Sequence, residues 1–454
     1  MAWNPPAAVG LAADNASWLV AGHLLRWIAA LFGGVLVARY LGPERFGSYR
    51  FVASMVTICI PFWTLGLTSI LSKELLEQPL EQGSILGTAL LLRLVAGVLG
   101  SVLLISSVIL LGGSDRSIGL YAAIFSVGGC FSCLEALRPW FEIRAAARRI
   151  VPAQTVMTYV TAAAKGLLVI LQAPLVIFVV VGSIDLAVGG LASLFAFVRQ
   201  RQSLTGFRFK SRLARGLLRR SWPLLLSGFA SAIYFKIDQL MLGWLVSYRA
   251  SGIYAVAASL SEMWYILATV LAASIFPFLI KLRKANENAY NVRLQQGYDL
   301  LFMLALILAI ATTALARPLV SVLYGTAFAA AAPVLMIHIW AATFMFMREL
   351  FGKWLIIEDL YIYALLTHVA AAVLNVALNF ILIPYAQEIG AAVATVISYA
   401  VAGPVSALLF PRTRRAGRMM ARAATAPLRV VVRPRAYLAV LGAGGLDGPD
   451  GLRS

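Results

Sequence analysis

Long apolar runs separated by short polar stretches constrain this chain more than any other feature. A run of about 20 apolar residues crosses roughly 30 Å of hydrocarbon as an α-helix, which satisfies its backbone polar groups within one segment. Hydrophobic residues make up 61% of the 454 and charged residues only 13%, whereas soluble domains are roughly 45–50% apolar. The sequence therefore predicts an all-α polytopic membrane protein.

We predict twelve membrane spans in two sets of six. They cover residues 16–38, 48–71, 85–112, 118–137, 151–171 and 174–198, and then 221–246, 253–280, 300–316, 333–351, 361–383 and 389–410. The predicted domains are a six-helix lobe (1–198), a basic linker (199–220), a second six-helix lobe (221–410) and a basic tail (411–454). No basic stretch precedes the first run and no small-residue cleavage site follows it, so we expect that run to be retained.

The distribution of Lys and Arg predicts the orientation of the spans. The even-numbered loops and the tail carry 27 of these residues, whereas the odd-numbered loops carry six. Because basic loops stay on the cytoplasmic side, both termini are predicted to be cytoplasmic. The same positions explain the net charge of +19 by contact with anionic lipid headgroups. Nucleic acid is therefore not an expected partner.

A short motif occurs twice at corresponding places in the two halves. Gly47-x-Tyr49-x-x-x-Ala53-Ser54 returns as Gly252-x-Tyr254-x-x-x-Ala258-Ser259. Each copy lies in a hairpin between two apolar runs. Matching hairpins in matching halves are typical of a transporter built from two structural repeats with its binding site between them.

Ten charged residues lie at membrane depth within the predicted spans, with Arg50, the third residue of span 48–71, counted among the basic residues of the first loop. An ionised side chain at the bilayer centre costs roughly 2.5–3.5 kcal/mol. We therefore expect these residues to face a water-filled cavity, to pair with one another, or to reach a headgroup region. They are Arg26, Arg93, Lys165, Lys236 and Arg348, and the acids Glu135, Asp185, Asp238, Glu262 and Glu349.

The basic residues of this set differ in depth. Arg26 and Lys165 lie near the middle of their spans, so both are candidate cavity cations. Arg93 and Arg348 lie nearer span ends, where extension to a headgroup is an equal alternative. Lys236 is two residues from the acid at position 238, and residues two apart do not share a helix face.

The acids are candidates either for ion coupling or for charge balance. Asp238 and Glu262 flank the second hairpin and could hold a proton or a sodium ion, and Glu135 is a third candidate. Cys130 and Cys133 form an isolated C-x-x-C pair without a second pair or a His cluster, so we expect no metal site and no cofactor. The phosphate-binding motif G-x-x-x-x-G-K-[ST] is absent from the sequence, which excludes a self-contained ATP pump.

Several motifs together resemble the bacterial polysaccharide (O-antigen-type) oligosaccharide flippases of the multidrug/oligosaccharidyl-lipid/polysaccharide exporter superfamily. The resemblance extends from about residue 17 to residue 410, and the order and spacing of the motifs carry it. They are Arg39-Tyr-Leu-Gly-Pro-Glu-Arg-Phe-Gly-Ser-Tyr49, Asp238-Gln-Leu-Met-Leu-Gly243 with Gly252-Ile-Tyr254, Leu323-Tyr-Gly325-x-x-Phe328, Asn375-x-x-x-Asn379-Phe-Ile-Leu-Ile-Pro384 and Gly390-Ala-Ala-x-Ala-Thr-x-Ile-Ser-Tyr399.

The resemblance implies two six-helix lobes that form a V around a central cavity with alternating access. It also implies a glycan on a polyprenyl diphosphate as cargo, moved outward across the bacterial inner membrane for surface polysaccharide synthesis. A polysaccharide polymerase and chain-length proteins are the implied partners, together with membrane lipids. In such a protein Arg26, and less directly Lys165 and Lys236, would lie near the diphosphate.

Two other functions are compatible with parts of this pattern. A drug/cation antiporter of the same fold would need a cavity dominated by acids and aromatic residues. A membrane glycosyltransferase or ligase would need an outward loop with catalytic carboxylates or a histidine. The longest predicted outward loop, 317–332, contains neither, so we expect a transporter and not an enzyme.

Overall fold

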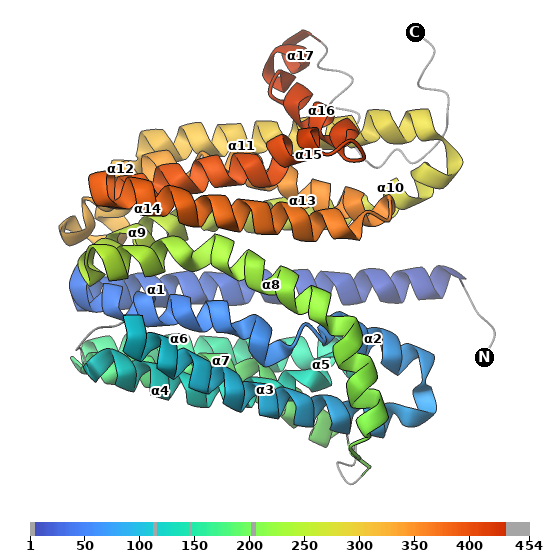
Figure 1. Ribbon diagram of the computed structural model, residues 1–454, viewed down its shortest axis with the longest axis horizontal. Helices are drawn as coiled ribbons and strands as arrows, with labels where there is room; N and C mark the ends of the chain where they lie inside the picture. Colours follow the sequence, from blue (N-terminus) through green and yellow to red (C-terminus); the bar gives the residue numbers. More distant parts are fainter. Residues whose placement is uncertain (1–4, 112–115, 145–146, 201–205, 433–454) are drawn as a thin grey trace. The chain divides into compact units, whose positions relative to one another are not determined.

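The computed structural model describes residues 5–111, 116–144, 147–200 and 206–432, and all of its regular elements there are helices (Figure 1). The parts 201–205 of the predicted linker and 433–454 of the predicted tail lie outside the described residues. The elements are α1 (Pro5–Thr64), α2 (Thr68–Glu77), η1 (Pro79–Glu81), α3 (Gln82–Leu111), α4 (Arg116–Phe131), η2 (Ser132–Leu137), α5 (Arg138–Glu142), α6 (Ala147–Ile170), α7 (Leu175–Arg199), α8 (Ser211–Leu245), α9 (Tyr248–Glu262), α10 (Tyr265–Ala285), α11 (Glu287–Tyr324), η3 (Thr326–Phe328), α12 (Ala331–His338), α13 (Ala341–Ile357), α14 (Tyr361–Ala400), the π-helix η4 (Val401–Val405), α15 (Ser406–Leu409), α16 (Arg414–Ala423) and α17 (Ala426–Val432).

The prediction of an all-α polytopic membrane protein is confirmed. Among the described residues, eight helical segments are long and apolar enough to cross a membrane, or nine if the bent pair α12–α13 is one span. Two of these segments, Ala21–Glu77 and Tyr361–Leu409, each cover two of the predicted spans. Each predicted span therefore falls on one helix, on part of a long helix, or on consecutive helices.

The two merged segments contain residues with non-helical backbone angles. Gly42 in α1 has φ 70° and ψ 173°, and Pro43 follows it. Glycine adopts the left-handed region without a steric penalty, and proline suits the first position of a new helix. Gln387 in α14 has φ 46° and ψ −123°, a conformation that is costly for a residue with a side chain. The predicted turn at Gly42 thus follows from its Gly-Pro sequence. The predicted turn at Gln387 instead contains a strained residue.

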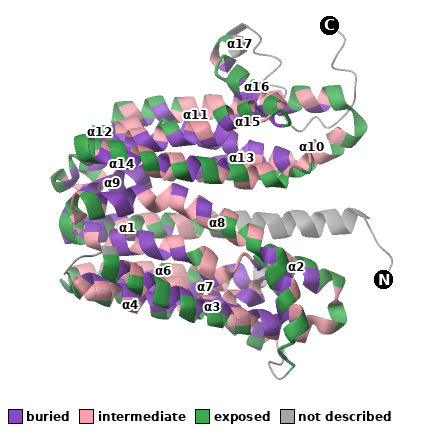
Figure 2. Cartoon of the chain, viewed as in Figure 1, coloured by how far each residue is buried: buried purple, intermediate pink, exposed green. Residues whose placement is uncertain are grey.

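The chain divides into two compact units. Unit 1 contains Met1–Ser259, Arg317–Val334 and Ala372–Ala394, and unit 2 contains Leu260–Ala316, Leu335–Ala371 and Thr395–Ser454. Buried and exposed positions alternate along the helices of both (Figure 2). Unit 1 contains the whole first predicted lobe and parts of the second, and unit 2 contains the rest of the second lobe and the tail. The lobe boundaries stay a prediction.

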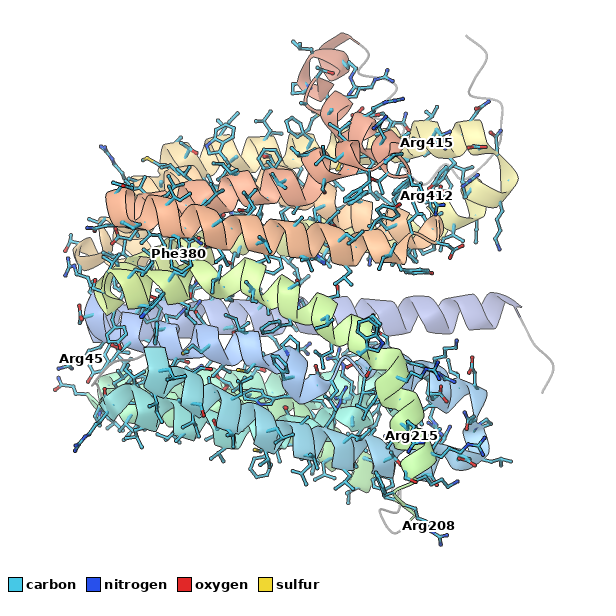
Figure 3. All side chains as sticks on the ribbon, viewed as in Figure 1. Arg45, Arg208, Arg215, Phe380, Arg412 and Arg415 are labelled. Carbon is cyan, nitrogen blue, oxygen red and sulfur yellow. The ribbon has the colours of Figure 1, made fainter. Side chains whose placement is uncertain are left out.

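Unit 1 is held together by close helix contacts in its apolar core. Trp63 on α1 is 1% exposed, and its ring lies so close to Gly100 and Gly129 that a Cβ on either glycine would be 2.5 Å from it. Arginine side chains lie at both ends of unit 1. Figure 3 places Arg45 at the end where α1 turns, and Arg208 and Arg215 at the end where α8 begins.

The linker end of unit 1 is fixed by ion pairs. Arg220 on α8 pairs with Glu74 on α2, which is 4% exposed. Lys210 pairs with Glu81 at 3.0 Å. These contacts position the start of α8 against α2 and η1.

In unit 2, the predicted basic tail begins as an ordered part of the fold. Asp299 on α11 is fully buried, and Arg429 on α17 donates to both of its oxygens at 2.8 and 2.9 Å. Ala416, Gly417, Met420 and Ala423 form the buried face of α16. Arg415, labelled in Figure 3, pairs with Glu287 at 3.1 Å.

Candidate functional site

A cavity of about 440 Å³ that contains charged lining residues lies inside unit 1, bounded by α1, α6 and α7. Ser259 at one edge and Tyr324 at another complete it. Its charged lining residues are Arg26 and Arg50 from α1, Lys165 from α6 and Asp185 from α7. Charged side chains from three helices therefore face one space.

Two of the predicted cavity cations are in this lining. Arg26 is half-buried and donates to Thr155 Oγ1 at 3.5 Å, a long contact that leaves the guanidinium available to a ligand. Lys165 forms an ion pair with Asp185 across the cavity wall. The predictions that Arg26 and Lys165 bind substrate are untested, but both side chains have access to one space.

Sequence reasoning missed Arg50 as a cavity residue. We counted it with the basic residues of the first loop, although it is the third residue of the predicted span 48–71. The structure places it in the cavity lining, where its Nη2 donates to Gln239 Oε1 at 3.5 Å and its buried Nε has no hydrogen-bond partner among the described residues. The sequence did contain a signal for this position. Arg50 follows Phe46 by four residues on α1, so the two share a helix face, and both line the cavity.

The two copies of the repeated motif contact one another directly. A Cβ built on Gly47 would overlap the carbonyl oxygen of Tyr248 and lie 3.0 Å from the nitrogen of Gly252. A Cβ on Gly252 would overlap the carbonyl oxygen of Pro43 and lie 3.1 Å from the Cα of Gly47. We call this meeting of Gly47, Gly252 and the two neighbouring carbonyl groups the hairpin contact. It requires glycine on both sides.

Polar side chains reinforce the hairpin contact next to the cavity. Gln239 on α8 is 1% exposed and accepts a hydrogen bond from Ser54 on α1 at 2.8 Å. The backbone carbonyl of Gln239 accepts from Ser251 on α9 at 2.8 Å. Phe46 packs edge-on against Phe328, with ring centroids 6.0 Å apart. Cavity and hairpin contact thus share α1, and Arg50 of the cavity lining donates to the same Gln239.

The two tyrosines of the repeat have different roles. Tyr49 lines the cavity, and its hydroxyl lies against Gly182 on α7. Tyr254 is buried and donates to Asp238 Oδ2 at 2.9 Å. The same pattern therefore serves a cavity in one copy and a buried carboxylate in the other.

Asp238 belongs to a buried polar cluster outside the cavity lining. It is 2% exposed and accepts hydrogen bonds from Tyr254 and from Asn379 on α14. Asn379 also donates to Asn375 Oδ1 at 3.3 Å, and both asparagines are fully buried. The motif Asn375-x-x-x-Asn379 is thus brought to the predicted ion-coupling residue. Within the described part of the chain, no group of three His, Cys, Asp or Glu residues is arranged to hold a metal ion.

Arg93 and Glu135 both lie apart from the cavity. Arg93 on α3 is 1% exposed and donates to Thr68 Oγ1 at 2.8 Å. Glu135, in the short helix η2, is the acid whose charge acts on it. The carboxylate of Glu135 rests against the backbone of Gly189. This pair is a packed feature of the lobe interior, and neither residue lines the cavity.

The other predicted site residues are also outside the cavity lining. Arg348, in unit 2, is 6% exposed and donates to Thr367 Oγ1 at 2.9 Å and to the carbonyl of Ala402, in η4, at 2.8 Å. Lys236 on α8, Glu262 at the end of α9 and Glu349 on α13 are half-buried. The structure therefore brings together only a part of the predicted set.

Comparison with known proteins identifies the family. Residues 12–283, more than half of the chain, match the family model for polysaccharide biosynthesis protein. No curated protein sequence matches the chain.

Solved transporter structures share the fold over nearly the whole chain. The lipid II flippase MurJ, in an inward closed conformation, has a TM-score of 0.68 at 13% identity and covers 94% of this chain and 99% of its own. An inward-facing multidrug resistance MATE family transporter of the MOP superfamily has a TM-score of 0.66 at 14% identity, with 88% and 95% covered. A MOP superfamily transporter from Pyrococcus furiosus, described by the reverse polarity of its binding pocket, has a TM-score of 0.61 at 15% identity, with 90% and 94% covered.

These neighbours have a twelve-helix fold in two lobes, which confirms the predicted fold class. The charged cavity and the paired repeat hairpins lie within the part of the chain that the family model covers, except for Tyr324 at the cavity edge. The chain belongs to the polysaccharide biosynthesis protein family and has the fold of the MATE and MurJ transporters.

Proposed function

We propose that the protein moves a polyprenyl-diphosphate-linked oligosaccharide from the cytoplasmic to the outer leaflet of the bacterial inner membrane, for surface polysaccharide synthesis. The diphosphate and the glycan would occupy the cavity, and the polyprenyl tail would stay in the lipid. Both termini would be cytoplasmic, and polymerase and chain-length proteins would receive the product outside. The protein would act as a transporter without catalysing a covalent step.

The charge of the cavity is the observation that carries this proposal. Arg26, Arg50 and Lys165 give it three cations, whereas Asp185 is the single acid among its described lining residues. A diphosphate cannot enter hydrocarbon without replacing its hydration by charged or polar contacts. Guanidinium and ammonium groups supply such contacts through strong charge-assisted hydrogen bonds.

The same charge disfavours the drug/cation antiporter as the alternative function. A cationic drug would be repelled by three basic side chains and attracted by one carboxylate that is already paired. An inside-negative potential would also assist the outward movement of an anion, by roughly 2.3 kcal/mol per charge per 100 mV. We therefore expect transport of a prenyl diphosphate, and no transport of a quaternary ammonium dye, in reconstituted vesicles.

Replacing Arg26 by Glu tests the proposed function. Arg26→Glu removes a cavity cation and adds a carboxylate beside the diphosphate. The loss of hydrogen bonds to a charged group is worth about 1.5–3 kcal/mol, so we expect transport to fall by more than tenfold. The measurement is the translocation of a fluorescent prenyl diphosphate-linked sugar in proteoliposomes.

The matched control is Arg45→Glu, the same change at an exposed arginine outside the cavity. It should transport normally. Membrane abundance of both variants should equal that of the wild type. Normal transport by Arg26→Glu would remove Arg26 from the mechanism.

We place ion coupling, if the cycle uses it, at Asp238. Its carboxylate is buried among Tyr254 and two asparagines, which is compatible with a proton or a sodium ion as well as with charge balance. Asp238→Asn keeps an oxygen that accepts the hydrogen bond from Tyr254 but removes the charge. We expect this variant to lose any acceleration of transport by an imposed sodium or proton gradient while it keeps slow transport driven by membrane potential. A variant that still responds fully to the gradient would place coupling elsewhere.

A further inference from the structure

Lys165 is the one cation of the described cavity lining that is already paired with an acid. Its ammonium group contacts the carboxylate of Asp185, and both groups remain open to the cavity, with side-chain exposures of 16% and 32%. Asp185 comes from α7 and Lys165 from α6, so the pair crosses the cavity wall between two helices. A ligand entering the cavity meets this ion pair directly.

We propose that Asp185 is a resident counter-ion that the anionic cargo must displace from Lys165. Before cargo binds, the carboxylate of Asp185 occupies the place on Lys165 that a phosphate oxygen would take. When the diphosphate binds, Lys165 turns to it and Asp185 is left facing a like charge. Asp185 therefore weakens binding and hastens release. This inference rests on the proposed function and explains how a strongly basic cavity avoids trapping its cargo.

The other charged groups at the cavity fit this role. Arg26 and Arg50 line the same space, and their hydrogen bonds to described residues are long, each at 3.5 Å. Neither arginine is paired with Asp185, the one acid of the described lining, so both can attract the anionic cargo. His23 and the hydroxyl groups of Tyr49 and Tyr324 are the remaining titratable groups there. One carboxylate opposing three cations sets the affinity at an intermediate value, because like charges placed together oppose binding.

The cavity also connects Asp185 with the hairpin contact. The hydroxyl of Tyr49 lies against Gly182, which precedes Asp185 by three residues on α7. Tyr49 itself is two residues from Gly47 in the first repeat hairpin. A movement of this hairpin that shifts α7 would alter the distance between Lys165 and Asp185. Release of the cargo can thus accompany the opening of the hairpin contact.

The test is equilibrium binding of farnesyl diphosphate to the full chain in lipid nanodiscs. We expect Asp185→Asn to bind at least about tenfold more tightly than the wild type, because it removes one like charge close to the ligand. Its transport rate should fall, because release becomes slow. Asp185→Glu retains the charge and should bind like the wild type. Lys165→Gln should bind more weakly, and the double variant Lys165→Gln/Asp185→Asn should bind more tightly than Lys165→Gln alone.

The control is Asp359→Asn, which removes one negative charge away from the cavity. Asp359 has φ 56°, a conformation that Asn tolerates well, so we expect unchanged binding. Weaker binding by Asp185→Asn would overturn the counter-ion role and make Asp185 a residue that positions Lys165. If the wild type and Arg26→Glu both fail to bind farnesyl diphosphate, the proposed function itself is wrong. If the wild type binds farnesyl diphosphate and Arg26→Glu does not, the proposed function stands. The affinity of Asp185→Asn relative to the wild type then decides the counter-ion role.

Discussion

Gly47→Ala is expected to abolish transport, although it adds a single methyl group. The new Cβ would overlap the carbonyl oxygen of Tyr248, and backbone atoms cannot turn aside as a side chain can. Overpacking of a well-packed contact costs about 1–3 kcal/mol, which shifts an equilibrium between closed and open hairpins by roughly five- to 150-fold. The arrangement with the hairpins in contact would therefore become a minor state.

Exposure of Ser54 provides the measurement. This residue is 2% exposed beside the hairpin contact. In a Ser54→Cys background the introduced thiol should be unreactive towards a water-soluble maleimide, and adding Gly47→Ala should make it reactive. Gly252→Ala should act in the same way, because it meets the same contact from the other repeat.

Gly119→Ala is the matched control, since a Cβ at Gly119 has no described atom within 4 Å. It should leave both transport and labelling unchanged. Wild-type transport by Gly47→Ala, together with an introduced thiol that stays unreactive, would show that the hairpins do not need this close approach.

Arg93→Leu is expected to destabilise the protein strongly without acting through the cavity. Arg93 is 1% exposed, and its removal leaves Thr68 Oγ1 without this donor and takes away one of the two arginines, Arg93 and Arg138, whose charges act on Glu135. Leaving a buried polar group without its hydrogen-bond partner costs about 1–3 kcal/mol, and the loss of a favourable charge near Glu135 adds to this. The measurement is thermal unfolding of the purified protein in detergent, where Tm should drop by several degrees.

A second substitution separates charge from packing. Because Arg93→Leu takes a favourable charge away from Glu135, removing that carboxylate as well in Arg93→Leu/Glu135→Leu should recover part of the lost stability. Arg208→Leu, at an exposed arginine, should leave Tm unchanged. If Arg93→Leu reduced farnesyl diphosphate binding with no change in Tm, Arg93 would belong with the cavity cations after all.

The pair Arg93 and Glu135 also shows where sequence reasoning stopped. Both were recognised as charges at membrane depth, because hydropathy is summed along the chain and a charge inside an apolar run is visible in it. Which of them would meet could not be read in this way. Pairing depends on the rotation of α3 against η2, and the two residues are 42 positions apart in the sequence.

Arg50 illustrates an error of the sequence analysis, because a residue counted with a loop lies in the cavity lining. It is the third residue of the predicted span 48–71, and counting it with the first loop left it out of the charges at membrane depth. The break at Gly42 sets the direction of the second part of α1, and this direction turns Arg50 into the cavity beside Tyr324. Tyr324 follows Arg50 by 274 residues, so no local pattern joins them.

The repeated motif was visible in the sequence, but its function was not. Identity of eight-residue patterns predicts corresponding hairpins. It does not predict that Gly47 and Gly252 pack against one another, or that Tyr49 faces a cavity while Tyr254 bonds to Asp238.

The sequence by itself determined that this is an all-helical membrane protein, with ionised side chains that need shelter from lipid. This follows from the composition of contiguous segments, because the cost of placing a group in hydrocarbon depends on that group and on its place in the span. Only the tertiary structure decided that Arg26, Arg50, Lys165 and Asp185 share one cavity while Arg93 and Asp238 do not. The reason is that side chains meet through the rotation and packing of helices distant in sequence, which no segment specifies alone.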